Sequence, residues 1–396
     1  MTSYHDLGLR QRPIVEARFR QEPLNERFAQ MAVRADGLVA EPFRGLTTDG
    51  LVVPNLYNLK PTGVSTAGMV DAAKRFLDVV GRDRAQLPIE SDTWRRWHNV
   101  HAYLFRHGAG LDSLDDKGRS LALKVVHSAL SDEGFGLTRD VMRLNHTIGE
   151  ITGRWAEYGE WTYWLAIYGE PSATEAWGWQ FDGHHVNLSC FVLGDQVTLT
   201  PAFLGSEPCW AEEGDHVDVQ VFDQETEAGL ALVRSLDADQ RRQAALAASI
   251  LPGKLAADRL TQYDHRLQAG AFGDNAIVAA EGIAANDLSD YQRRLLMQLV
   301  GVYIDRQSSG HARIRAEEVA ARLADMRFLW LGGTDDDSVF YYRLHSPVLW
   351  IEFDHQPGIA FANDEPTRHH VHTIVRSPNG NDYGRDLLRQ HYAKAH

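Results

Sequence analysis

The sequence predicts an α+β fold with a mainly antiparallel sheet core and segregated helices. Segments rich in β-branched and aromatic residues form two blocks, one near residues 163–200 and one near residues 327–376. Helical patterns lie before and between these blocks and do not alternate regularly with the strands. Such grouping is typical of α+β proteins, whereas a doubly wound parallel sheet would alternate strand and helix. No glycine-rich phosphate loop follows any of the strands, so nucleotide binding has no support.

The individual elements follow from periodicity and from start and stop signals. The apolar spacing of residues 70–80 predicts a helix that ends at Gly81, and another helix is expected over residues 316–326. Two further helices should begin with a capping box, in which a short polar residue and a glutamine three positions later satisfy free backbone amides. These pairs are Asp237 with Gln240 and Ser289 with Gln292. The predicted strands cover residues 163–168, 186–193, 197–200, 327–331, 338–344, 348–353 and 371–376.

Proline interrupts the first part of the chain repeatedly. We therefore expect residues 1–60 to be an extended segment that wraps around the rest, with a short strand at residues 50–53. Residues 61–396 are expected to form a single α+β domain.

The composition limits the classes of partner. The chain carries 54 acidic and 40 basic residues, a formal net charge of −14, so phosphate backbones and anionic lipid would repel it. No apolar run approaches the roughly 20 residues that span a bilayer. We expect a cytoplasmic protein with a small-molecule substrate and neither nucleic acid nor membrane as partner; a homo-oligomer is compatible with the sequence. The two cysteines form no disulfide framework: Cys190 is expected in the core and Cys209 at the surface.

Two adjacent histidines, His184 and His185, follow an aromatic stretch. Neighbouring side chains of a strand point to opposite faces, so we expect one imidazole to face a pocket and the other to face solvent. A turn or bulge at Gly183 would lift this restriction. These residues alone fit a packed structural histidine as well as a metal ligand, and His185 is the preferred ligand.

Near the C-terminus, His370 and His372 are two residues apart, so a strand places both imidazoles on one face. Two neutral imidazole nitrogens at this spacing can bind one zinc, copper or iron ion. Glu352 and Asp354 also share a face, where their carboxylates would repel each other unless a cation or a shared proton intervened. The alternatives are a polar strand end and an acidic edge strand that both face solvent.

Two histidines and one carboxylate, with open positions for water and substrate, suit a divalent transition metal such as zinc, iron or manganese. Such an ion can lower the pKa of a bound water to about 7 and so support hydrolysis. An iron ion held by the same groups could activate dioxygen, and the composition does not choose between the two reactions.

Several dispersed stretches recur together in one known family. They are WGWQFDGHH from Trp177, TPAFLGSEP from Thr200, WRRWHN from Trp94, YYRL from Tyr341, IEFD from Ile351, HVHTIVR from His370 and NDYG from Asn381. Over roughly residues 60–396 the sequence resembles the domain-of-unknown-function family 3500, whose name assigns no activity. The resemblance implies that the polar motifs belong to one shared site. Its candidate residues are His184, His185, Glu352, Asp354, His370, His372, Arg376, Asn381 and Asp382. Trp177, Trp179 and Tyr342 could form walls that stack on a flat substrate, and the alternative is plain core packing, which is favoured for Trp177.

The leading hypothesis is a metal-dependent enzyme that hydrolyses a small organic molecule. Two of His185, His370 and His372, with Glu352 or Asp354, would hold the metal, and the other carboxylate would act as general base. Arg376 could bind a substrate carboxylate through two parallel hydrogen bonds. The alternatives are a non-haem iron oxygenase-type enzyme, a metal-free enzyme with a histidine–carboxylate pair, and a non-enzymatic small-ligand-binding protein.

Overall fold

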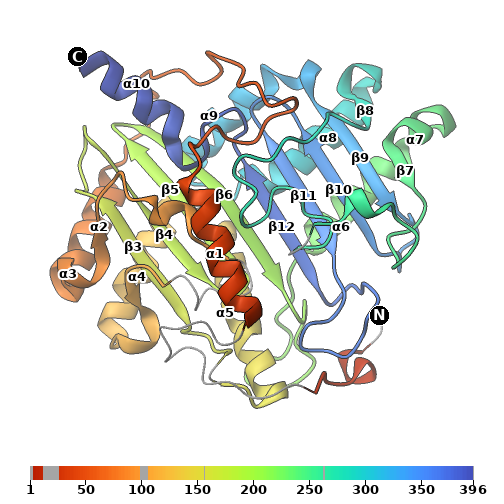
Figure 1. Ribbon diagram of the computed structural model, residues 1–396, viewed down its shortest axis with the longest axis horizontal. Coiled ribbons are helices and arrows are strands. Elements are labelled where there is room, and N and C mark those ends of the chain that lie inside the picture. Colours follow the sequence, from red (N-terminus) through yellow and green to blue (C-terminus); the bar gives the residue numbers. More distant parts are fainter. Residues whose placement is uncertain (1–2, 12–25, 99–105, 156, 262–263, 396) are drawn as a thin grey trace.

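One large sheet organises the computed structural model, which describes residues 3–11, 26–98, 106–155, 157–261 and 264–395 (Figure 1). Within these residues the sheet has twelve strands, and its main path runs in the order β1-β3-β4-β5-β6-β12-β11-β10-β9-β7. Every pairing is antiparallel except β1 with β3 and β7 with β9. The predicted α+β class with a mainly antiparallel sheet is confirmed.

The strands are β1 (Gln86–Leu87), β2 (Ala109–Gly110), β3 (Tyr163–Gly169), β4 (Ala176–Gly183), β5 (Val186–Leu193), β6 (Gln196–Ser206), β7 (Ala245–Ala247), β8 (Ile283–Ala284), β9 (Arg327–Gly332), β10 (Phe340–His345), β11 (Trp350–His355) and β12 (Val371–Arg376). The α-helices are α1 (Glu26–Ala40), α2 (Ala67–Val80), α3 (Arg82–Ala85), α4 (Asp116–Ala129), α5 (Asp132–Thr152), α6 (Asp223–Ser235), α7 (Ala238–Ala244), α8 (Asp290–Ile304), α9 (Ser309–Ala320) and α10 (Arg385–Ala395).

The two blocks of strands meet where β6 pairs with β12. This antiparallel pairing places His372 opposite Gly205 and Val371 opposite Ser206. On its other edge β12 pairs with β11, where His372 lies opposite Asp354. The start of β12 therefore lies beside strands from both halves of the chain.

The two faces of the sheet differ in chemistry. One face forms the main core with helices that contribute fully buried side chains, such as Phe76 of α2, Val125 of α4, Val141 of α5, Leu232 of α6 and Leu299 of α8. The opposite face carries buried polar side chains on β11 and β12, and α1 crosses in front of the sheet in Figure 1. The loop that follows β7 covers the polar face, because Gln268 and Ala269 donate backbone hydrogen bonds to Glu352.

Local signals placed several helices correctly. Both predicted capping boxes are present, at the starts of α7 and α8. The predicted helix over residues 70–80 is α2, which ends at Gly81 with a φ of +98°. The helix expected over residues 316–326 begins and ends earlier, as α9, and Leu323–Asp325 form a separate short 3-10 helix.

Other local expectations fail. Residues 26–40 form α1, although the proline-rich pattern predicts an extended segment there, and residues 50–53 form no strand. Cys209 was expected at the surface but is only 2% exposed, because it lies in the main core cluster. Among the helices that the structure describes, none is both long and apolar enough to cross a membrane.

Candidate metal centre

The hairpin between β4 and β5 turns at the two adjacent histidines. His184 and His185 are the two residues between Gly183 and Val186, which pair across the hairpin. They are buried, at 8% and 3% exposed. The expectation that one of them faces solvent is wrong, because strand alternation does not apply to residues in a turn. His185 has a φ of +62°, a left-handed conformation that is uncommon for residues other than glycine.

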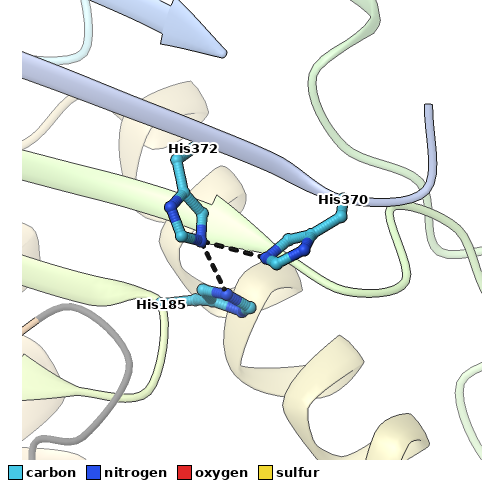
Figure 2. Close-up of side chains that lie close together, drawn as sticks. All are labelled: His185, His370 and His372. Carbon is cyan, nitrogen blue, oxygen red and sulfur yellow. Dashed lines mark hydrogen bonds between the residues drawn. The ribbon is translucent and has the colours of Figure 1, made fainter. Parts of the chain in front are cut away.

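The other two histidines come from the start of β12. His370 directly precedes the strand, His372 is its second residue, and both are buried. Figure 2 shows the imidazoles of His185, His370 and His372 pointing toward one another. The Nε2 atom of His372 lies 3.0 Å from Nε2 of His370 and 3.1 Å from Nε2 of His185.

This spacing matches the first coordination shell of a metal. Two nitrogens that each bind one ion at about 2.0–2.1 Å, with an angle between about 90° and 110° at the ion, lie about 2.9–3.4 Å apart. The two measured separations, 3.0 and 3.1 Å, fall inside that interval. The buried group of three histidines could therefore hold a metal ion.

Hydrogen bonds to the outer ring nitrogens fix two of the three tautomers. Nδ1 of His372 lies 2.6 Å from a carboxylate oxygen of Asp264, and Nδ1 of His370 lies 2.7 Å from the carbonyl oxygen of Pro357. Both oxygens can only accept from these nitrogens, so Nδ1 carries the proton in each ring. In the neutral rings Nε2 then carries a lone pair. Two lone pairs 3.0 Å apart repel each other unless a proton or a cation lies between them.

Burial disfavours the proton. The pKa of His372 lies well below its ordinary value, mainly because burial removes the imidazolium from water, and the neighbouring His370 and Arg266 lower it further. A neutral imidazole is the form that binds metal. The environment of His372 therefore favours a metal ligand over an imidazolium.

Gly205 of β6 lets two of the rings approach the sheet closely. A Cβ atom at this position would lie 2.9 Å from Cδ2 of His372, 3.1 Å from Cδ2 of His185 and 2.8 Å from the carbonyl oxygen of Val371. These separations are shorter than ordinary van der Waals contact. The absence of a side chain at Gly205 is thus part of how the site is built.

A buried polar network supports His372 from behind. The Asp264 oxygen that accepts from His372 also accepts from Gln356, whose amide donates in turn to Asp354. Arg266 donates to Asp354 at 2.5 Å. Burial raises the pKa of Asp354 to about 7 although Arg266 opposes the shift. Such outer partners fix the orientation of metal-binding imidazoles in other proteins.

One protein family matches most of the chain. The family described as "Protein of unknown function (DUF3500)" matches residues 62–385, which is more than half of the sequence. The chain belongs to the DUF3500 family. No curated protein and no solved structure matches it significantly. The family resemblance noted in the sequence is confirmed, and it carries no assigned activity.

In this DUF3500 protein the carboxylate of Glu352 is fully engaged by the protein. It accepts from the backbone amides of Gln268 and Ala269, from the hydroxyl of Tyr341 and from the indole of Trp350. The repulsion expected between Glu352 and Asp354 is relieved by these donors and by Arg266. The catalytic roles assigned to the two carboxylates stay predictions. Asp354 lies opposite His372 across the two strands, and the hydrogen bonds described between them run through Gln356 and Asp264.

Arg376 lies in a second buried network on the same face. It is fully buried and donates to the carbonyl oxygens of Ala269 and Gly270 and to the carboxylates of Asp274 and Asp382. Its predicted contact with a substrate carboxylate stays a prediction, since all four acceptors are protein groups. Two more candidates lie close by: Asp382 accepts from the backbone amide of Ser377, and Asn381 accepts from the amide of Leu387.

The three aromatic candidates lie in the main core. Trp177, Trp179 and Tyr342 are fully buried and belong to the cluster between the sheet and the helices. The Tyr342 hydroxyl pairs with that of Tyr303. His372 and Asp354 lie on the opposite face of the sheet. The predicted substrate-binding role of the three aromatic residues is untested and stays a prediction.

His184 supports the site without joining the group of three. Its ring stacks on His185 with centroids 3.9 Å apart, and its Nδ1 lies 2.7 Å from the side-chain oxygen of Asn145. The Asn145 amide donates to the carbonyl oxygen of Gly159, which fixes the orientation of the amide. Nδ1 of His184 is therefore the donor to Asn145.

Sequence reasoning missed three residues of the site: Asp264, Gly205 and Asn145. Asp264 lies in an irregular loop without a motif, and Asn145 is one of many polar residues on a long helix. Gly205 could have been noticed, because a glycine within a strand often marks a close approach of another group.

Proposed function

We propose that this protein is a metal-dependent enzyme that hydrolyses a small organic molecule at the centre formed by His185, His370 and His372. The observation that carries the proposal is the distance of 3.0 Å between the Nε2 atoms of His370 and His372, with Nε2 of His185 3.1 Å from that of His372. His185, His370 and His372 would hold a divalent cation, whose positive charge would relieve any repulsion between these nitrogens.

Three histidine ligands leave further coordination positions for water and substrate. A zinc ion held by three protein ligands is typical of catalytic zinc sites, whereas structural sites use four. When bound, such a metal lowers the pKa of a water to about 7, so that hydroxide is available near neutral pH.

The protein groups around the centre have separate roles. Asp264 holds the His372 ring in the tautomer that binds metal, and Pro357 does the same for His370. His184 and Gly205 define the position of His185. The three histidine side chains are at most 3% exposed, which supports a small substrate and an environment that excludes bulk water.

Metal analysis of the two β12 histidines tests the proposal. Untagged protein is expected to retain one equivalent of metal at this centre, which His370→Ala and His372→Ala should both lose. Hydrolysis of small activated esters, such as p-nitrophenyl acetate, should disappear after chelation and return with zinc, manganese or iron. If both variants retain the metal content of the unmodified protein, the assignment of these ligands is refuted.

A matched control distinguishes loss of a ligand from loss of a buried imidazole. His355 lies on the neighbouring strand β11, is 1% exposed and bonds through Nδ1 to the backbone of Phe340. His355→Ala should therefore keep the metal even if its stability falls. If the purified protein contains iron and consumes dioxygen in the presence of substrate, the oxygenase alternative is supported in place of hydrolysis.

The second candidate function is a metal-free acid–base enzyme. The contact of 2.6 Å between His372 and Asp264 favours it, because a carboxylate that orients an imidazole is a common arrangement for proton transfer. Full ester hydrolysis after exhaustive chelation would support this candidate against the metal centre.

A further inference from the structure

A second group of possible ligands lies between α5 and the loop that precedes α6. His146 and Glu150 are one helical turn apart on α5, and Asp215 lies in the loop. We propose that this group binds a second divalent metal, of the zinc class, which ties the loop at residues 214–216 to α5. This site is separate from the three-histidine centre, and the proposal does not depend on the proposed reaction.

The distances leave room for an ion. Nε2 of His146 lies 3.8 Å from a carboxylate oxygen of Glu150 and 3.6 Å from one of Asp215. A direct histidine–carboxylate hydrogen bond is shorter, as between His127 and Asp132 at 2.8 Å in the same protein. Ligand atoms bound to one ion at about 2.0–2.2 Å lie roughly 3.0–3.5 Å apart, so a contraction of a few tenths of an ångström completes the site.

The Glu150 carboxylate provides an independent observation. Its Oε2 atom is buried and has no hydrogen-bond partner among the described residues. Its Oε1 atom accepts from the backbone amide of Asp215 at 3.3 Å. The side chain as a whole is 25% exposed, and its Oε1 is the atom 3.8 Å from Nε2 of His146. A buried carboxylate oxygen without a donor costs free energy, and a cation bound by both carboxylate oxygens would satisfy Oε2.

The loop is shaped to approach this carboxylate. Gly214 has a φ of +87°, and a Cβ atom there would lie only 2.4 Å from Oε2 of Glu150. Among the ion pairs of the described residues, Glu150 and Asp215 are paired with His146 and with no lysine or arginine. The two nearby arginines are engaged elsewhere, Arg143 with Asp140 and Arg139 with Glu160. The two carboxylates therefore face the imidazole of His146, with the His216 ring 5.1 Å from it, and no lysine or arginine of the described residues, an arrangement that attracts a cation.

A metal here would stabilise the surroundings of the main centre without touching it. The residue before His146 on α5 is Asn145, which holds His184. The loop also carries Glu212, which accepts from Ser3 and from the backbone of Tyr4. We therefore assign the second metal a structural role, in which it fixes the loop against α5.

Counting zinc equivalents tests the second site. Stripped protein is titrated with zinc alone, and the bound metal is measured after gel filtration. The unmodified protein should bind two equivalents, His146→Ala one, His370→Ala one, and the double variant none. His127→Ala, which removes a surface histidine from a pair without a third ligand, should still bind two.

The outcomes separate the two sites. If His146→Ala binds as much zinc as the unmodified protein, the second site is refuted. If the unmodified protein binds a single equivalent that His146→Ala loses and His370→Ala keeps, the second site stands and the three-histidine centre fails. Zinc at ten times its dissociation constant should also slow the hydrogen exchange of the backbone amides of residues 214–216 about tenfold. This holds for amides that exchange through a local opening in which the metal site is broken. Unchanged exchange would refute the role in fixing the loop.

Discussion

Replacing Asp264 should weaken metal binding at the three-histidine centre although Asp264 is not itself a ligand. One of its oxygens accepts both the His372 ring at 2.6 Å and the Gln356 amide at 3.0 Å. In Asp264→Asn the amide oxygen can keep both hydrogen bonds, so this variant removes the charge alone. Asp264→Ala removes the charge and both acceptors.

The size of the effect follows from the geometry. An ion at Nε2 of His372 would lie about 7 Å from the Asp264 carboxylate, where a charge of −1 attracts a charge of +2 by about 5 kcal/mol at an effective dielectric constant of 20. Solvent relaxation and the other ligands reduce this figure. Losing an outer-shell partner of a metal-binding histidine typically costs a factor of about 10–100 in affinity, or about 1.4–2.7 kcal/mol. We expect the loss of metal affinity in Asp264→Asn to lie near the lower end of that range and the loss in Asp264→Ala to lie near the upper end.

Competition with a chromophoric chelator measures these affinities. Glu225→Gln serves as the control, because Glu225 is also a buried carboxylate, paired with Arg306 on the helical side of the sheet. Its zinc affinity at the centre should be unchanged. Affinity within twofold of the unmodified protein in Asp264→Ala would refute the reasoning, since the variant lacks every contact by which Asp264 could act on the metal.

Three further predictions concern packing, backbone strain and pH. Gly205→Ala should lose metal at the centre, because its Cβ would overlap the His372 and His185 rings and the Val371 carbonyl. Denaturant titrations should show a loss of about 1–3 kcal/mol of unfolding free energy. Metal content and stability equal to those of the unmodified protein would contradict this prediction. Both His185→Ala and His185→Gly should lose metal. In the metal-free state the glycine variant should have the higher unfolding free energy by about 1 kcal/mol, because the φ of +62° strains residues that carry a Cβ. Equal stabilities of the two variants would show that no strain is present. Burial lowers the pKa of His355 to about 3, so below pH 6.5 the unfolded chain binds a proton that the folded chain does not, and stability falls with falling pH. Between pH 7 and 5, the loss of unfolding free energy in His355→Gln should be about 2 kcal/mol smaller than in the unmodified protein, because the effect is about 1.4 kcal/mol per pH unit below 6.5. Parallel curves of stability against pH for the two proteins would refute the lowered pKa of His355.

The roles assigned to the site residues stay predictions, but the sequence did single out the three histidines that lie together. His372 lies on β12 and His370 directly precedes it, and periodicity and turn signals were enough to identify that strand. His185 was preferred over His184, and the structure brings His185 to the other two. The predicted partner carboxylate illustrates the limit, because Glu352 and Asp354 lie on the same face of the sheet but their oxygens are taken by Gln268, Ala269 and Arg266.

The sequence by itself determined the fold class, the capped helices, most of the strands and the histidines that could act as ligands. These features depend on local preferences, such as side-chain periodicity and end-capping hydrogen bonds, which are encoded within a few neighbouring residues. Only the tertiary structure decided that β6 pairs with β12, which brings the hairpin turn at His185 next to His372 almost two hundred residues later. It also decided that Asp264 is the carboxylate behind His372, because an irregular loop has no period from which its long-range contacts can be inferred. The convergence of the three nitrogens depends on sheet register and on the missing side chain of Gly205, and both are properties of packing between distant segments.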